Sequence, residues 1–346
     1  MPPKSARQPR LRQEPLEEFF RQVPLFQDFT PDELTDLRIL AQPFSVPGGA
    51  RLFNQGTPAQ GLYVIERGTV QILARTAGDA AVELARVGPR EVIGEVSLLD
   101  RGSHAAGARA LEPVAGYLLG SGQFDVLLGG LRSSAFKISY SIARILCGRI
   151  RQRIADLEPR GRRARGRDYA PPGPRRAQPG LPAAHLTRPD IVRALPLFRP
   201  FAPGELREFL AIARVLEKPR GAVLLREGGP PASCYVVVRG ALHLGLADGA
   251  ASAQIAILGP GRMAGEIALT DGLPQPVACT VREPAVLLEL PRKRFEALRE
   301  RRDPLAFRFF DQVSQSLVAI QRKTVRNTTR IASQQANHRP KPRRRG

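Results

Sequence analysis

The sequence is short of cysteine and of long apolar runs. Its 346 residues include three scattered cysteines, Cys147, Cys234 and Cys279, an odd number that argues against a disulfide framework and fits no metal-site spacing. They predict reduced, buried thiols. No apolar run approaches the length of a membrane span, and residues 1–15 lack the apolar stretch of a signal peptide. These absences predict a cytoplasmic protein without a membrane span.

Motifs that carry catalytic chemistry are also lacking. There is no P-loop, no nucleophile elbow and no metal-binding spacing, and His185, His243 and His338 form no cluster. We therefore expect no enzymatic activity. A helix-turn-helix domain has no room either, because Pro, Gly and Arg dominate residues 159–188, which are predicted not to be helical.

Acidic residues are almost missing from three segments. The net charge is +21, and nearly all of that excess lies in residues 1–12, 159–188 and 321–346. The remainder is close to neutral, so nothing in the sequence predicts a basic face on a folded domain. The arginine-rich segments either bind nucleic acid, an anionic membrane surface or an acidic partner, or they simply reflect a biased composition.

What the sequence does contain is a duplication. The stretch VPLFQDFTPDEL at 23–34 recurs as LPLFRPFAPGEL at 195–206, and GLYVIERGTV at 61–70 recurs as SCYVVVRGAL at 233–242. GEVSLLD (94–100) recurs as GEIALTD (265–271). The same parts follow in the same order at a nearly constant offset, so the chain is built from two copies of one unit.

Each unit is predicted to be a small antiparallel jelly roll with flanking helices. Leu62, Val64, Val70 and Ile72 alternate with polar neighbours, which is typical of half-buried strands, and turns at Gly68 and Gly240 are expected to separate paired strands. A helix should begin after the Thr30 cap, and another after Asp303 and Pro304, with Leu305, Phe309, Val313, Leu317 and Ile320 on one apolar face.

These signals predict a mainly β chain with two tandem jelly-roll (double-stranded β-helix) domains. The predicted segments are a basic N-terminal segment (1–19), domain 1 (20–158), a Pro/Arg-rich linker (159–190), domain 2 (191–332) and a basic tail (333–346).

The ordered set of motifs resembles the cyclic nucleotide-binding domain, the family of the bacterial catabolite activator protein and of the regulatory subunit of the cAMP-dependent kinase. The marks are Tyr-Val-(Ile/Val)…Gly at 63–68 and 235–240, and Gly-Glu-(Val/Ile)-(Ser/Ala)-Leu at 94–98 and 265–269. The resemblance implies that a short helix after the Gly-Glu pair points its backbone N–H groups at the cyclic phosphate. It also implies that the glutamate accepts the ribose 2′-hydroxyl and that a following arginine forks onto the phosphate.

Carried onto this sequence, the Gly-Glu pair is present twice, but the arginine position holds His104 in the first unit and Gln275 in the second. The second unit also has Pro276 next, which removes a backbone donor. The candidate nucleotide-binding residues are Gly94, Glu95, Val96, His104, Ala105, Gly265, Glu266, Ile267 and Gln275.

Each candidate has a plainer alternative. Glu95 and Glu266 either accept the ribose or merely fix their own loops, and His104 is either a weak phosphate donor or a solvated loop histidine. Arg101 and Arg109 follow nearby, and alternation leaves open whether Arg109 faces the pocket. Arg262 is expected to be a surface charge. Losing the phosphate arginine costs about 2–5 kcal/mol, which lowers affinity roughly 30- to 3000-fold.

The sequence therefore predicts a non-enzymatic regulatory protein that signals through the helix after each barrel to an unidentified protein partner. Its first domain would be a weakened cyclic AMP or cyclic GMP site and its second a pseudo-site. The alternative is a scaffold with dead pockets whose arginine-rich segments bind nucleic acid or an acidic partner. Apolar spacing along the helix after the first barrel predicts either a weak homodimer or packing of that helix back onto its own barrel. That stripe is Phe136, Tyr140, Ala143, Cys147, Ile150, Ile154 and Leu157.

Overall fold

The computed structural model describes residues 15–75, 81–100, 102–163, 188–246 and 254–337. The chain divides into two compact units, of which the first comprises Met1–Ile142 with Arg326–Gly346 and the second Ala143–Val325. Most of the predicted N-terminal segment, linker and tail lies outside the described residues. No helix in the described ranges is long and apolar enough to cross a membrane.

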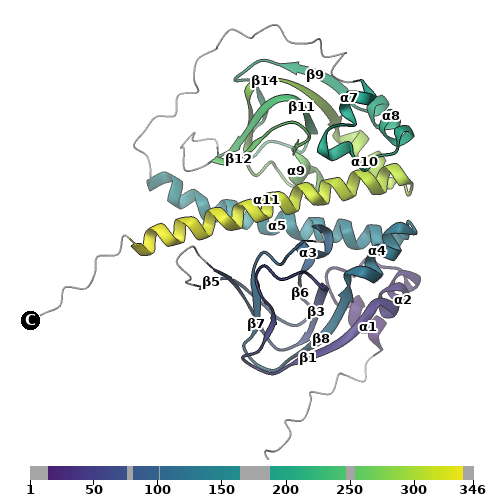
Figure 1. Ribbon diagram of the computed structural model, residues 1–346, viewed down its shortest axis with the longest axis vertical. Helices are drawn as coiled ribbons and strands as arrows, with labels where there is room; N and C mark the ends of the chain where they lie inside the picture. Colours follow the sequence, from purple (N-terminus) through teal and green to yellow (C-terminus); the bar gives the residue numbers. More distant parts are fainter. Residues whose placement is uncertain (1–14, 76–80, 101, 164–187, 247–253, 338–346) are drawn as a thin grey trace, which may run out of the picture. The chain divides into compact units, whose positions relative to one another are not determined.

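The first unit is a barrel of two four-stranded antiparallel sheets (Figure 1). The strand orders are β1-β8-β3-β6 and β2-β7-β4-β5. The strands are β1 (Ala41–Val46), β2 (Arg51–Phe53), β3 (Gly61–Arg67), β4 (Val70–Arg75), β5 (Ala81–Val87), β6 (Val92–Ile93), β7 (Gly107–Ala110) and β8 (Val114–Gly120). Two layers with non-sequential neighbours make a jelly roll, which confirms the predicted fold class.

Strand β3 differs from the half-buried strand that its alternation predicts. Tyr63 and Ile65 join the apolar core inside the barrel. Leu62 and Val64, on the opposite face, are equally buried, because helices cover that side of the sheet. In the first helix of the chain, for example, Phe19 packs its ring against Tyr117 of β8, with ring centroids 5.4 Å apart.

Gly68 is not a hairpin turn, contrary to the prediction. The strands on its two sides, β3 and β4, do not pair with each other but belong to different sheets. Gly68 has φ = 85°, and a Cβ there would lie 2.5 Å from the carbonyl oxygen of Pro113. A glycine is needed where the chain bends from one layer into the other with another strand in close contact.

The helices of the first unit include two at its start, and Thr30 caps the second of them as predicted. The amide of Glu33 donates to Thr30 Oγ1 at 3.4 Å, and the amide of Thr30 donates to Glu33 Oε2 at 2.9 Å. The helices are α1 (Leu16–Arg21), α2 (Pro31–Leu40), α3 (Glu95–Asp100), α4 (Ser121–Gly129) and the start of α5 (Ser133–Arg163).

The second unit repeats the architecture with longer strands. Strand β11 (Ser233–Gly245) and strand β14 (Ala278–Pro291) run continuously through both layers and pair with each other along most of their lengths. Gly240, with φ = 86°, lies inside β11 and so corresponds to the bend at Gly68. The other strands are β9 (Arg214–Lys218), β10 (Val223–Leu225), β12 (Gln254–Leu258) and β13 (Met263–Ala264).

Helix α11 (Pro304–Asn337) follows the second barrel. Asp303 caps it, because its Oδ1 accepts from the amide of Ala306 at 2.9 Å. All five residues of the predicted apolar face, from Leu305 to Ile320, are buried, which confirms that prediction. The other helices of the unit are α7 (Pro189–Val192), the short 3₁₀ helix η1 (Pro196–Phe198), α8 (Pro203–Ile212), α9 (Glu266–Asp271) and α10 (Arg292–Glu300).

Helix α5 is longer than predicted. It continues through residues 159–163, which were predicted to begin a non-helical linker. Along its second half, in the second unit, Ala143, Cys147, Ile150 and Ile154 are all buried within the single chain. These four residues belong to the second unit and not to the unit of the barrel that precedes the helix, so their burial does not confirm the predicted packing of the helix onto its own barrel. The homodimer stays a prediction. The side chain of Leu157 lies outside the described residues.

Candidate nucleotide-binding sites

Each predicted site begins with a glycine that no other residue could replace without strain. Gly94 has φ = 88° and Gly265 has φ = 92°. A Cβ on Gly94 would lie 2.5 Å from the carbonyl oxygen of Gly61, and one on Gly265 would lie 2.4 Å from that of Ser233. The left-handed turn and the close approach of β3 or β11 together require glycine. Each glycine leads directly into a six-residue helix, α3 or α9.

The glutamate after each glycine is buried. Glu95 is 2% exposed and Glu266 is 1% exposed. A buried carboxylate needs hydrogen-bond donors, and in the second unit one is supplied by α11, where Ser316 Oγ donates to Glu266 Oε1 at 2.6 Å. Burial nevertheless raises the pKa of Glu266, against the lowering effect of the Ser316 hydrogen bond. Thus the second glutamate already has a partner within the chain.

The raised pKa of Glu266 predicts a stability effect with a definite sign. The pKa of Glu266 in the folded state lies above the ordinary value of 4.5. The free energy of unfolding is therefore larger at acid pH, and it falls as the pH rises from 4.5 through the folded-state pKa. Glu266→Gln removes the ionisation, so the variant should melt at a higher temperature than wild type at pH 8, with the difference shrinking toward pH 4.5. Thermal melting at both pH values measures this. Glu217→Gln, which changes an exposed carboxylate of β9, is the matched control. A difference that stays constant with pH would contradict the assignment.

The two residues at the arginine position are buried as well. His104 is 3% exposed, so it is not the solvated loop histidine considered from sequence. Its imidazole stacks on Phe53 with ring centroids 3.7 Å apart and an interplanar angle of 9°. Gln275 is 4% exposed, its backbone exchanges hydrogen bonds with Gly228 and Gly229, and its Nε2 is buried without a hydrogen-bond partner.

Arg151, on α5, holds the chain that follows α9. Its Nε and Nη2 donate to the two carboxylate oxygens of Asp271 at 2.6 and 2.9 Å, and its Nη1 donates to the carbonyl oxygen of Pro274 at 2.7 Å. The side chains of Arg151 and Asp271 are only 20% and 9% exposed. A forked, largely buried pair of this kind fixes both position and orientation. Sequence reasoning missed it, as it missed Ser316, because no local pattern joins such distant residues.

Two of the other arginines considered from sequence, Arg109 and Arg262, are exposed and do not enter the barrel interior. Arg109 is exposed while its neighbours Ala108 and Ala110 are buried in the core, so alternation places Arg109 on the outer face of the sheet. Arg262 is exposed, as expected of a surface charge. Arg101 lies outside the described residues.

The three cysteines are buried, as predicted, and none of them is joined in a disulfide in this structure. Burial raises the pKa of each thiol. Across the described ranges, no group of three or more His, Cys, Asp or Glu side chains is placed to hold a metal ion.

The family described as "Cyclic nucleotide-binding domain" matches residues 43–129 and 215–302, which together make up just over half of the chain. The chain belongs to the cyclic nucleotide-binding domain family. It contains two such domains, one in each unit, and a cyclic nucleotide is the ligand that gives the family its name. This confirms the resemblance drawn from the repeated motifs.

Among curated proteins, the chain is 33% identical to the cyclic AMP receptor protein of Thermus thermophilus over 39% of this chain and 60% of that protein. It is 27% identical to a cAMP-dependent protein kinase regulatory subunit of Colletotrichum orbiculare over 36% of this chain and 31% of that one. A solved regulatory domain of Toxoplasma gondii PKA with cAMP covers 94% of this chain and 96% of that chain, at 16% identity and a TM-score of 0.31. The chain spans less than two thirds of the length of both curated relatives.

Proposed function

We propose that the chain is a non-enzymatic regulatory protein in which the first domain binds a cyclic nucleotide weakly and the second is a pseudo-site. The observation that carries the proposal is that neither domain has an arginine at the position where the family's phosphate-binding arginine is expected. Both domains keep the glycine and the buried glutamate, yet buried His104 and buried Gln275 stand where the family's phosphate-binding arginine is expected. A free imidazole is mostly neutral at pH 7, and an amide carries no charge.

The two domains differ in how far their own side chains occupy the site. In the second domain Ser316 already donates to Glu266, and Arg151 braces Asp271. A ribose hydroxyl would have to compete with Ser316 for a carboxylate that is 1% exposed. Pro276 also lacks the backbone donor that a phosphate could use. These contacts support a second domain that keeps the fold of a sensor but not its binding capacity.

Signalling is proposed to pass through the helix after each barrel. Support comes from the second domain, where α11 contributes the hydroxyl that meets Glu266. Because the second domain is proposed to be a pseudo-site, the coupling itself is proposed for the first domain, where a helix in contact with the nucleotide position would have different energies in the free and the bound state. The weak homodimer and the binding of nucleic acid or an acidic partner by the arginine-rich segments stay predictions.

A thermal-shift experiment on the full chain tests this function. Millimolar cyclic AMP or cyclic GMP at about ten times the dissociation constant should stabilise the first domain by about 1.4 kcal/mol. Glu95→Ala should abolish the shift, whereas Glu266→Ala should leave the ligand-induced shift unchanged. Stabilisation by neither nucleotide would contradict the sensor and favour the scaffold with dead pockets. A shift lost in Glu266→Ala but kept in Glu95→Ala would reverse the roles of the domains.

A further inference from the structure

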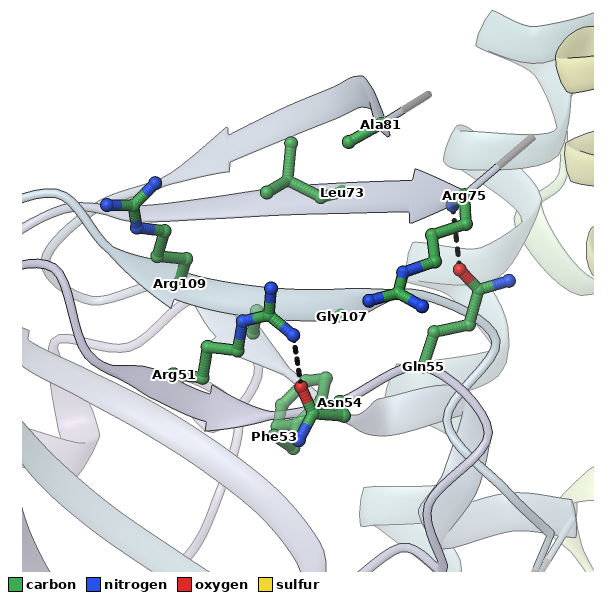
Figure 2. Close-up of a pocket in the computed structure, with 10 residues that line it drawn as sticks. Arg51, Phe53, Asn54, Gln55, Leu73, Arg75, Ala81, Gly107 and Arg109 are labelled. Atoms are coloured by element: carbon green, nitrogen blue, oxygen red, sulfur yellow. Dashed lines mark hydrogen bonds between the residues drawn. The ribbon is translucent and has the colours of Figure 1, made fainter. Parts of the chain in front are cut away.

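A second polar site lies on the outer face of the sheet β2-β7-β4-β5 in the first unit (Figure 2). It is a pocket of about 60 Å³ between the ends of β2, β4 and β7. Its lining residues are Arg51, Phe53, Asn54, Gln55, Leu73, Arg75, Ala81, Gly107, Ala108 and Arg109. None of them is acidic, and three are arginines.

The strand register explains why these arginines share one face. Arg51 of β2 lies directly opposite Arg109 of β7, and Arg109 lies opposite Gln71 of β4. Ala108 and Ala110 point into the core, so Gly107 and Arg109 point outward. Gly107 contributes no side chain, and Figure 2 shows the guanidinium groups of Arg51 and Arg75 on either side of it. Because Gly107 has no side chain, the space between the two guanidinium groups is left unfilled.

The local hydrogen bonds orient Arg51 and Arg109 without neutralising them. Arg51 Nη1 donates to Asn54 Oδ1 at 2.7 Å, and Arg109 Nε donates to the carbonyl oxygen of Gly49 at 3.1 Å. Both acceptors are uncharged. The amide of Arg75 donates to the Gln55 side chain at 2.8 Å, which ties the end of β4 to the loop after β2.

The nearest carboxylate on this sheet is engaged elsewhere. Glu83 of β5 accepts from Arg86 Nε at 2.9 Å and from the amide of the Gln71 side chain. The hydrogen bond from Arg86 lowers the pKa of Glu83, which keeps the carboxylate charged and matched to that arginine. The positive charge of Arg51 and Arg109 therefore has no carboxylate partner among the residues that the structure describes.

Size and chemistry restrict what this pocket can take. Its volume has room for a few water molecules, hence for one small oxyanion rather than for a base or a sugar. Guanidinium groups match tetrahedral and planar oxyanions with paired N–H donors, and several of them around one group favour a doubly charged ligand. A nucleic acid would call for a longer basic track that follows successive phosphates.

We propose that this arginine pocket binds a single dianionic phosphoryl group. The site is distinct from the cyclic nucleotide positions, since its arginines project from the outer face of the barrel, whereas Glu95 and His104 are buried. Phe53 is the residue that the two positions share, because it lines the pocket and stacks on His104. The phosphoryl group could be carried by a small free phosphate or by a phosphorylated side chain of a partner, and the chemistry of recognition is the same for both.

The test titrates the full chain with three probes by calorimetry: inorganic phosphate, a phosphoserine peptide, and the same peptide without phosphate. Binding of both phosphate-containing probes but not of the plain peptide is expected. If only the phosphoserine peptide binds, the source is a protein partner, and if only inorganic phosphate binds, it is a small molecule. Both results keep the proposal, whereas binding of neither phosphate-containing probe would refute it.

Two variants locate the site. Arg51→Gln with Arg109→Gln should weaken phosphoryl binding at least tenfold, and Gly107→Leu should do the same by filling the space between the guanidinium groups while all charges remain. The control is Arg207→Gln with Arg214→Gln, which removes two exposed charges from the second unit and should change affinity less than twofold.

An equal loss of affinity in the two double arginine variants would mean that the probe is attracted non-specifically by charge. Wild-type binding by Gly107→Leu, checked for folding by circular dichroism, would place the anion elsewhere. Displacement of the probe by short duplex DNA at equal phosphate concentration would assign the surface to nucleic acid instead.

Discussion

Replacing His104 by arginine is expected to raise the affinity of the first domain for its cyclic nucleotide at least tenfold. The gain follows from restoring a charge-assisted fork to the phosphate, since losing such a group costs about 2–5 kcal/mol. The site can accommodate the change because His104 stacks face to face on Phe53 at 3.7 Å. A guanidinium plane stacks on an aromatic ring in the same way. Isothermal calorimetry on the full chain measures the affinity and should give one nucleotide per chain.

Three further variants show whether the gain arises for this reason. His104→Gln copies the residue of the second domain and should give no gain. Glu95→Ala in the His104→Arg background should remove the gain, because the ribose acceptor is lost. Gln275→Arg should gain less than His104→Arg, since Glu266 is held by Ser316. No increase for His104→Arg, with the fold intact, would mean that something other than the missing charge closes the first site.

The parts of the fold that sequence could predict are those that repeat or have a local signature. The Thr30 and Asp303 caps, the apolar face of α11 and the Gly-Glu pairs all depend on residues a few positions apart. Two copies in the same order made the jelly roll predictable. The burial of β3 on both faces was not, because alternation cannot tell a solvated face from one covered by a helix.

The finer features of the sites depend on contacts between distant residues. Ser316 reaches Glu266 across 50 positions and Arg151 reaches Asp271 across 120. No periodicity links such pairs. The arginine pocket was missed for a related reason, since net charge over the folded domains is near zero. Only the register of β2 against β7 reveals that Arg51 and Arg109 lie side by side while Glu83 is paired with Arg86.

Arg151→Ala is expected to lower the free energy of unfolding of the second unit by about 2–4 kcal/mol. Breaking a buried ion pair costs about 3–5 kcal/mol because the remaining charge is left without a partner. A somewhat smaller value is expected here, because the Arg151 side chain is 20% exposed. For a unit of this size the melting temperature should fall by roughly 5–15 °C. Denaturant unfolding and calorimetry measure the two quantities.

A double-mutant cycle with Asp271→Ala separates the pair from the individual side chains. If Arg151 acts through Asp271, the double variant should be little less stable than either single variant, so that the two losses are far from additive. Arg144→Ala, which removes an exposed arginine from the same helix, is the matched control and should change stability by less than about 0.5 kcal/mol. Arg151→Ala, unlike this control, should also speed amide hydrogen exchange at Leu269 and Gly272. Their N–H groups donate to Gly265 and Ala268, within and just after α9. Additive losses, or exchange that is unchanged in this segment, would show that Arg151 does not hold the second site in place.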